Sequence, residues 1–177
     1  MPIQKRKLSQ SEVTIEIDLE KLLGGAANNR IVREVFFQAA FDKMLERLDK
    51  GVGADGKNLP KYTKAYKNSL EYYVYGKDGT VNMQLTGGMV NSLEIKKSDN
   101  KKMTVGFSGD EENAKAYGHL TGFAGHPTLD GKVKPRNFFG WTDSELIAIA
   151  EDLKPNAQDE PKINDSKILS LLDRLIG

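Results

Sequence analysis

The hydrophobic pattern changes its period once within the first fifty residues, and this change limits the chain to few architectures. Residues 13–19 alternate apolar and polar side chains with a period of two, as a half-buried strand does. Residues 26–50 place their apolar side chains on a broad helical stripe. Asn28 or Asn29 can cap this helix, and Gly51 stands where a C-terminal cap glycine would. At ~1.5 Å per residue the helix is roughly 30 Å long, enough to cover one face of a sheet.

Two further alternating runs predict a hairpin in the middle of the chain. Residues 93–96 and 103–107 alternate on either side of a polar tip. Residues 143–153 follow a helical pattern, with Thr142 or Asp143 as the cap. These elements predict an α+β fold, in which a long N-terminal helix packs on a small, mostly antiparallel sheet, with a long loop and C-terminal helices.

The segments between these elements carry weaker signals. Residues 1–10 are polar and basic, so we expect a solvated, poorly ordered start. Residues 85–93 fit a turn followed by a short helix or by the entry to a strand, and residues 113–118 fit a short helical turn. Glycine and proline breakers fill residues 121–132, which predicts an exposed loop that serves as a contact surface rather than a catalytic one.

The domain organisation follows from a proline-rich stretch near the end of the chain. Residues 1–153 form one predicted α+β domain, and residues 154–163, which are polar and contain two prolines, form a linker. Residues 164–177 are amphipathic and predict a short C-terminal helix. Such a helix is marginal alone in water, so its apolar face docks either on its own domain or on a neighbouring molecule. That face contains Ile168, Leu171, Leu172 and Leu175.

Composition excludes several classes of protein. Lysine and arginine number 26 and aspartate and glutamate 25, whereas chains that coat nucleic acid usually carry a basic excess. The absence of cysteine excludes disulfides, thiolate nucleophiles and cysteine-ligated metals. The first 30 residues lack the apolar core of a signal peptide, and no window approaches the ~20 apolar residues of a membrane span. We therefore expect a soluble product of the cytoplasm without membrane contact.

Basic and aromatic residues interleave in residues 61–75, and two interpretations of this segment stay open. Lysines beside tyrosines can neutralise and stack on single-stranded nucleic acid, with Tyr62, Lys64, Tyr66 and Lys67 as the contact residues. The alternative is a short helix or loop whose tyrosine rings pack together and keep their hydroxyls in water. A nucleic-acid-binding module is therefore the second functional hypothesis for this chain.

Signals for catalysis are few. His119 and His126, with Asp110, Glu111 and Asp130 nearby, could bind a metal and support a small hydrolase, which is the third hypothesis. Zinc sites normally need three or four ligands at tight spacing, and none of the usual metal, nucleophile or nucleotide signatures is present. We predict no catalytic residue, no metal site and no cofactor.

Arg136 is the charged residue with the most distinctive surroundings in the sequence. It follows Pro135 and precedes the aromatic run Phe138, Phe139 and Trp141. A guanidinium in this setting can stack on rings and donate bidentate hydrogen bonds. It can pin the turn internally, to a carboxylate or to carbonyls, or it can contact another subunit, and the sequence leaves both roles open.

Several motifs follow the long helix in a definite order. They are Asp55-Gly56, a tyrosine-rich segment at 62–69, Leu-x-Gly-x-x-x-x-Ser-Leu at 85–93, Val-Gly-Phe at 105–107, an Ala- and Gly-containing segment at 114–122, and Pro-Arg-x-Phe-Phe-Gly-x-Thr at 135–142. In this order they resemble one known family, the virion-morphogenesis or tail-completion proteins of tailed bacteriophages. The resemblance covers roughly residues 26–153. The family's usual Ala-x-x-His-x-x-Gly step differs here by an extra glycine in 116–122 and an insertion that reaches His126.

The resemblance implies a structural virion protein rather than an enzyme. It implies a homo-oligomeric ring at the head–tail neck or the top of the tail, made in the host cytoplasm, which joins the tail to the head. Its partners would be sister copies, other neck, tail-tube or tail-terminator proteins, and DNA passing through the channel. Subunits of a ring meet through two different patches. The residues expected at such contacts are His119, Phe123, His126, Arg136, Phe138, Phe139, Trp141, Leu171, Leu172 and Leu175.

Overall fold

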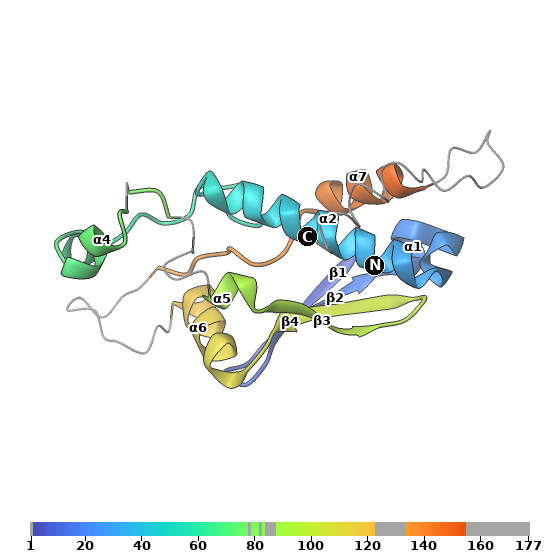
Figure 1. Ribbon diagram of the computed structural model, residues 1–177, viewed down its shortest axis with the longest axis horizontal. Coiled ribbons are helices and arrows are strands. Elements are labelled where there is room, and N and C mark those ends of the chain that lie inside the picture. The colour runs from blue at the N-terminus through green and yellow to red at the C-terminus, as the bar shows by residue number, and fades with distance from the viewer. Residues whose placement is uncertain (1, 78, 82, 84–87, 123–133, 155–177) are drawn as a thin grey trace.

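The computed structural model describes residues 2–77, 79–81, 83, 88–122 and 134–154, and it confirms the α+β class (Figure 1). Helices gather around one antiparallel sheet of four strands. In chain order the elements are β1 (Gln4–Leu8), β2 (Val13–Asp18), α1 (Leu19–Leu23), a 3-10 helix (Gly24–Asn28), α2 (Arg30–Asp49), α3 (Lys64–Lys67), α4 (Leu70–Val74), α5 (Gly88–Asn91), β3 (Leu93–Ser98), β4 (Lys102–Phe107), α6 (Asp110–Thr121) and α7 (Asp143–Leu153).

The sheet has the strand order β1-β2-β4-β3, and each neighbouring pair is antiparallel. β2 and β4 form its centre, with Ile15 opposite Val105. Side chains alternate between the faces of a strand, so Val13, Ile15 and Ile17 enter the core together. The predicted strand at 13–19 and the predicted hairpin at 93–107 are both confirmed.

The expectation of a poorly ordered start is wrong for residues 4–8. They form β1, which pairs with β2 over its whole length. Its side chains are mostly exposed, so the strand leaves no apolar alternation in the sequence. Two side chains also bind the segment before α7: Gln4 donates to the carbonyl of Trp141, and Arg6 donates to the carbonyl of Phe139.

The long helix is α2, and it covers one face of the sheet, with α1 and α7 beside it (Figure 1). Asn29 caps its start by accepting a hydrogen bond from the backbone N–H of Ile31 at 2.9 Å. The helix does not stand at the N-terminus as predicted, because β1, β2 and α1 precede it.

A buried ion pair joins α2 to α7. Arg47 donates through Nη1 to both carboxylate oxygens of Glu145, at 2.9 and 2.7 Å, and through Nη2 to the carbonyl of Gly140 at 2.6 Å. Glu145 also completes a capping box with Thr142, which starts α7 where the sequence predicted. A buried charge is tolerated when an opposite charge lies beside it, and Glu145 supplies that charge, while Nε of Arg47 is buried without a hydrogen-bond partner among the described residues.

Asn113 holds α6 against the sheet. The sequence predicted a short turn at 113–118, whereas the helix has 12 residues and begins at Asp110. The side-chain oxygen of Asn113 accepts from the backbone N–H of Val13 at 2.8 Å, and its amide donates to the carbonyls of Phe107 and Gly109. This buried amide therefore has partners on β2, at the end of β4 and before α6, and it fixes the angle at which α6 leaves the sheet.

Three predictions fall outside the described residues. They concern most of the loop at 121–132, the linker at 154–163 after its first residue, and the helix at 164–177. α6 ends at Thr121, and Gly122 follows with a left-handed φ of 79°. The short helix α5 occupies part of residues 85–93, where the sequence left a helix and a strand entry open.

Candidate functional site

Arg136 links three segments that are far apart in the sequence. Its backbone N–H donates to the carbonyl of His119 at 2.8 Å, and its Nη1 lies 3.3 Å from Nδ1 of the same histidine. Its guanidinium carbon lies 5.6 Å from the centre of the Tyr62 ring, a cation–π contact. Arg136 therefore pins the segment before α7 internally, as one of its two predicted roles required. Its side-chain partners are the imidazole of His119 and the ring of Tyr62 rather than the carboxylate or carbonyls that were expected.

His119 is neutral near pH 7. A guanidinium only donates hydrogen bonds, so Nδ1 of His119 accepts from Arg136 and the proton of the ring is on Nε2. Burial and then the positive charge of Arg136 lower the pKa of His119 to about 4. The same neighbouring cation disfavours a metal ion on Nδ1. Among the described residues no group of three His, Cys, Asp or Glu side chains could hold a metal, and His126 lies outside those residues.

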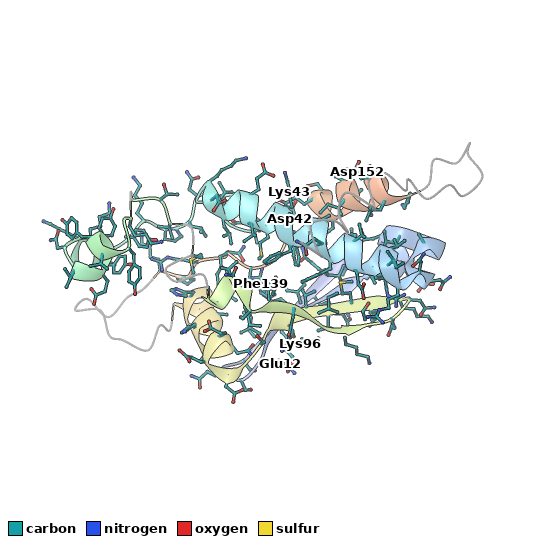
Figure 2. The ribbon with its side chains drawn as sticks, in the orientation of Figure 1. Glu12, Asp42, Lys43, Lys96, Phe139 and Asp152 are labelled. Atoms are coloured by element: carbon teal, nitrogen blue, oxygen red, sulfur yellow. The ribbon has the colours of Figure 1, made fainter. Side chains whose placement is uncertain are left out.

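The aromatic run after Arg136 belongs to the core. Phe138 and Phe139 are fully buried and Trp141 is 2% exposed, so the structure places these three predicted contact residues where a neighbouring subunit does not reach them. Phe139 lies 4.8 Å from Phe107 between ring centres, and Figure 2 shows it between α2 and the sheet. Trp141 donates from Nε1 to the carbonyl of Ala40 in α2 at 2.6 Å. Burial gives each ring far more contact area than a surface turn would.

Residues 61–76 form a segment that begins beside the core at Tyr62 and that we call the tyrosine arm. It contains the short helices α3 and α4, and Figure 1 shows α4 at one end of the molecule, apart from the sheet. Thr63 caps α3 by accepting from the N–H of Tyr66, and Ser69 caps α4 by accepting from the N–H of Tyr72. Each helix has at most five residues, so ring packing rather than helix propensity must hold the arm together.

Three tyrosine rings of the arm pack on one another. The ring centres of Tyr62 and Tyr66 are 5.0 Å apart, and Tyr72 lies 6.0 and 5.8 Å from them in edge-to-face geometry. Burial raises the pKa of Tyr66, so this phenol stays protonated at neutral pH. The packing interpretation of residues 61–75 is therefore favoured for these three rings, because stacking on one another leaves less ring face for a nucleic-acid base.

The other side of α4 exposes apolar side chains to solvent. Leu70 is 74% exposed, and Tyr73 and Val74 are each 69% exposed. We call these three residues the apolar tip. Tyr73 and Val74 come three and four positions after Leu70, so all three share a face of the helix. Tyrosines of the arm were predicted as contact residues from the sequence, but Leu70 and Val74 were not. Their spacing carried the signal, yet a five-residue helix is too short for a pattern of this kind to stand out.

The remaining predicted contact residues divide into two groups. His119 and Arg136 are brought together, but both are largely occupied within the chain. The other five, Phe123, His126, Leu171, Leu172 and Leu175, lie outside the described residues.

No family model, curated protein or solved structure matches the chain. In the described part of the chain, no helix is both long enough and apolar enough to cross a membrane.

Proposed function

We propose that this chain is a structural subunit of a tailed-phage virion, located in the neck or at the top of the tail, where copies assemble into a ring that joins the tail to the head. Two kinds of observation support the proposal. The first is the order of motifs that the chain shares with tail-completion proteins. The second, which carries the most weight, is the apolar tip on an arm that stands away from the body. Neighbouring neck and tail proteins, and DNA in the channel, are the further contacts proposed.

The apolar tip is hard to explain in a protein that acts alone. Scattered apolar side chains are normal on protein surfaces, but Leu70, Tyr73 and Val74 are adjacent and each is more than two-thirds exposed. Aromatic and aliphatic side chains in such groups typically form the buried centre of an interface. A subunit whose work is to contact other subunits accounts for this surface, and it requires no catalytic residue.

Light scattering on the full-length protein over a range of concentrations, followed by negative-stain imaging, tests the proposal. We expect the mass to rise with concentration and ring-shaped particles to appear. Mass spectrometry of purified virions of the parent phage should then find the chain among the neck or tail proteins. A protein that stays monomeric throughout and is also missing from virions would overturn the proposal.

One observation favours a nucleic-acid-binding module as a second candidate. Lys61 and Lys64 are exposed on the arm, and Tyr73 and Tyr75 keep accessible rings. Fluorescence anisotropy with a labelled single-stranded oligonucleotide at low salt tests it. Binding through Z phosphates makes log K fall against log salt with a slope of about −0.7Z, so a steep slope that Lys64→Glu reduces would support the module. Absence of binding at low salt would exclude it.

A further inference from the structure

We infer that the tyrosine arm of one copy docks on the outer face of α7 of a second copy. This inference deepens the proposed function, on which it rests, by naming the two surfaces that meet. It depends on three observations: the solvent-exposed apolar tip, opposite charge on the arm and on α7, and the separation of the two surfaces within one molecule.

The arm combines an apolar tip with positive charge. Residues 61–76 contain three lysines, Lys61, Lys64 and Lys67, against a single acidic residue, Glu71. Lys61 and Lys64 are exposed, as is the tip itself. A partner for this surface must therefore offer apolar side chains surrounded by negative charge.

α7 offers that combination on its outer face. Asp143, Ile147 and Glu151 are exposed and follow one another at a spacing of four, so they lie on one side of the helix. Ile147 is 41% exposed, which makes it one of the few large apolar side chains on the surface of the described chain. The helix contains four acidic residues and no basic residue from Asp143 to Leu153. Glu145 pairs with Arg47, whereas the exposed Asp143 and Glu151 lie on the same side of the helix as Ile147.

The two surfaces cannot meet within one molecule. Figure 1 places α4 at one end of the molecule, whereas α7 packs on α1 and α2 away from that end. Contact between them therefore joins two copies through different patches, and an interface of that type produces a closed ring or an open chain rather than a symmetric dimer. Opposite charge on the two patches also disfavours the alternatives of arm on arm and α7 on α7.

Single-cysteine variants test this arrangement directly, since the natural chain contains no cysteine. Tyr73→Cys places a thiol on the arm and Ile147→Cys places one on α7. Treating a mixture of the two variants with a short bis-maleimide should give cross-linked dimers, while each variant treated alone should give few. A mixture of Tyr73→Cys with Lys5→Cys, whose thiol lies on the exposed edge strand β1, is the matched control and should also give few.

Charge variants provide a second measurement that does not depend on the cross-linker. Lys64→Glu or Glu151→Lys alone should weaken self-association, and the double variant should recover most of it. Tyr73→Ala should weaken association about tenfold or more, as truncation of a central aromatic contact does. Lys5→Glu has the same charge change as Lys64→Glu and should leave association unchanged.

The possible failures are distinguishable. If the protein forms multimers but Tyr73→Cys cross-links only to itself, or the charge variants have no effect, the arm does not dock on α7 and the proposed ring still stands. If light scattering and imaging show a monomer at every concentration, both the docking and the self-assembled ring are overturned. Single-stranded DNA that protects Tyr73→Cys from the maleimide would place nucleic acid on the arm and would also overturn the docking.

Discussion

At the scale of single residues, Arg47 and His119 show two different surroundings for a buried basic side chain. The guanidinium of Arg47 donates hydrogen bonds to Glu145 and to the carbonyl of Gly140. His119 has Arg136 as its neighbour instead, so it gives up its charge. In each case the stability of the fold depends on one neighbouring side chain, and variants of these residues measure that dependence.

Removing one member of the Arg47–Glu145 pair should destabilise the protein strongly. Glu145→Ala leaves the buried guanidinium without its carboxylate and opens the capping box, so we expect a loss of about 3–5 kcal/mol in the free energy of unfolding. Urea denaturation followed by circular dichroism measures it. Glu34→Gln, which breaks the exposed pair with Arg30, is the control and should cost less than about 1 kcal/mol. Equal losses in both variants would contradict the structural role of the buried pair.

Protonation of His119 should destabilise the fold as the pH falls. Its pKa is about 4 in the folded protein, below the ordinary value of 6.5, so the unfolded chain binds the proton more readily. The free energy of unfolding is therefore unaffected by His119 above pH 6.5. It falls by about 3 kcal/mol in total as the pH decreases from 6.5 to 4.

Urea denaturation at several pH values checks this dependence. The slope of the free energy of unfolding against pH, between pH 6.5 and 4, should be smaller in His119→Gln than in the natural protein. His126→Gln, which changes the second of the two histidines, should keep the slope. An unchanged slope in His119→Gln would show that other groups cause the pH dependence.

At the scale of elements, the contact between β2 and β4 is closer than ordinary side chains permit. Gly106 stands opposite Thr14, and a Cβ atom at position 106 would lie 2.7 Å from Cγ2 of Thr14 and 2.9 Å from the carbonyl oxygen of Val13. One of these atoms belongs to the backbone and cannot move away alone. The two central strands therefore require glycine at this position.

Gly106→Ala should cost about 1–3 kcal/mol in unfolding free energy, the usual range for an overpacked interior. Gly25→Ala is the matched control, because a Cβ there meets nothing within 4 Å and its φ is not in the left-handed region. The control should be neutral or slightly stabilising. Thermal denaturation of both variants compares them, and equal melting temperatures would contradict the predicted clash.

The elements also show which parts of the fold the sequence could predict. β2, the β3–β4 hairpin and α7 were predicted because their patterns are local: alternation in the strands, and a capping box before the helix. β1 was missed because backbone pairing with β2 holds it and its exposed side chains carry no pattern. The start of α6 was missed because its first three residues, Asp110, Glu111 and Glu112, are acidic and add nothing to an apolar pattern. The partner of Asn113 on β2 lies 100 positions away in the sequence.

The candidate site was predictable only in part, for the same reason. Arg136 was singled out from its neighbours, but its contact with Tyr62 joins residues 74 positions apart, and no local pattern reports that contact. Phe138, Phe139 and Trp141 were predicted as contacts with another subunit, whereas the structure buries them in the core. An aromatic run beside proline and glycine fits a surface turn as well as a core segment. Only the positions of α2 and β4 decide which of the two occurs.

At the scale of the whole molecule, the buried interior of the described residues is complete before the predicted linker. Its members extend from Val13 to Ala150, and α7 ends at Leu153. A chain truncated after Lys154 should therefore remain folded and unfold cooperatively in urea, while we expect its assembly to be impaired if the amphipathic segment at 164–177 contacts a neighbour. Circular dichroism and light scattering on the same sample measure both. Global unfolding of the truncated chain would contradict this division.

The central position of β2 has a consequence for synthesis on the ribosome. β2 is among the first elements made, but its partner β4 begins at Lys102, and the rings of Phe138, Phe139 and Trp141 that fill the space under α2 arrive later still. Until then the apolar face of α2, with Phe36 and Met44, has no complete core to pack against. Nascent chains that stall before Trp141 are therefore the forms of this protein most exposed to aggregation, and the ones for which a chaperone is most useful.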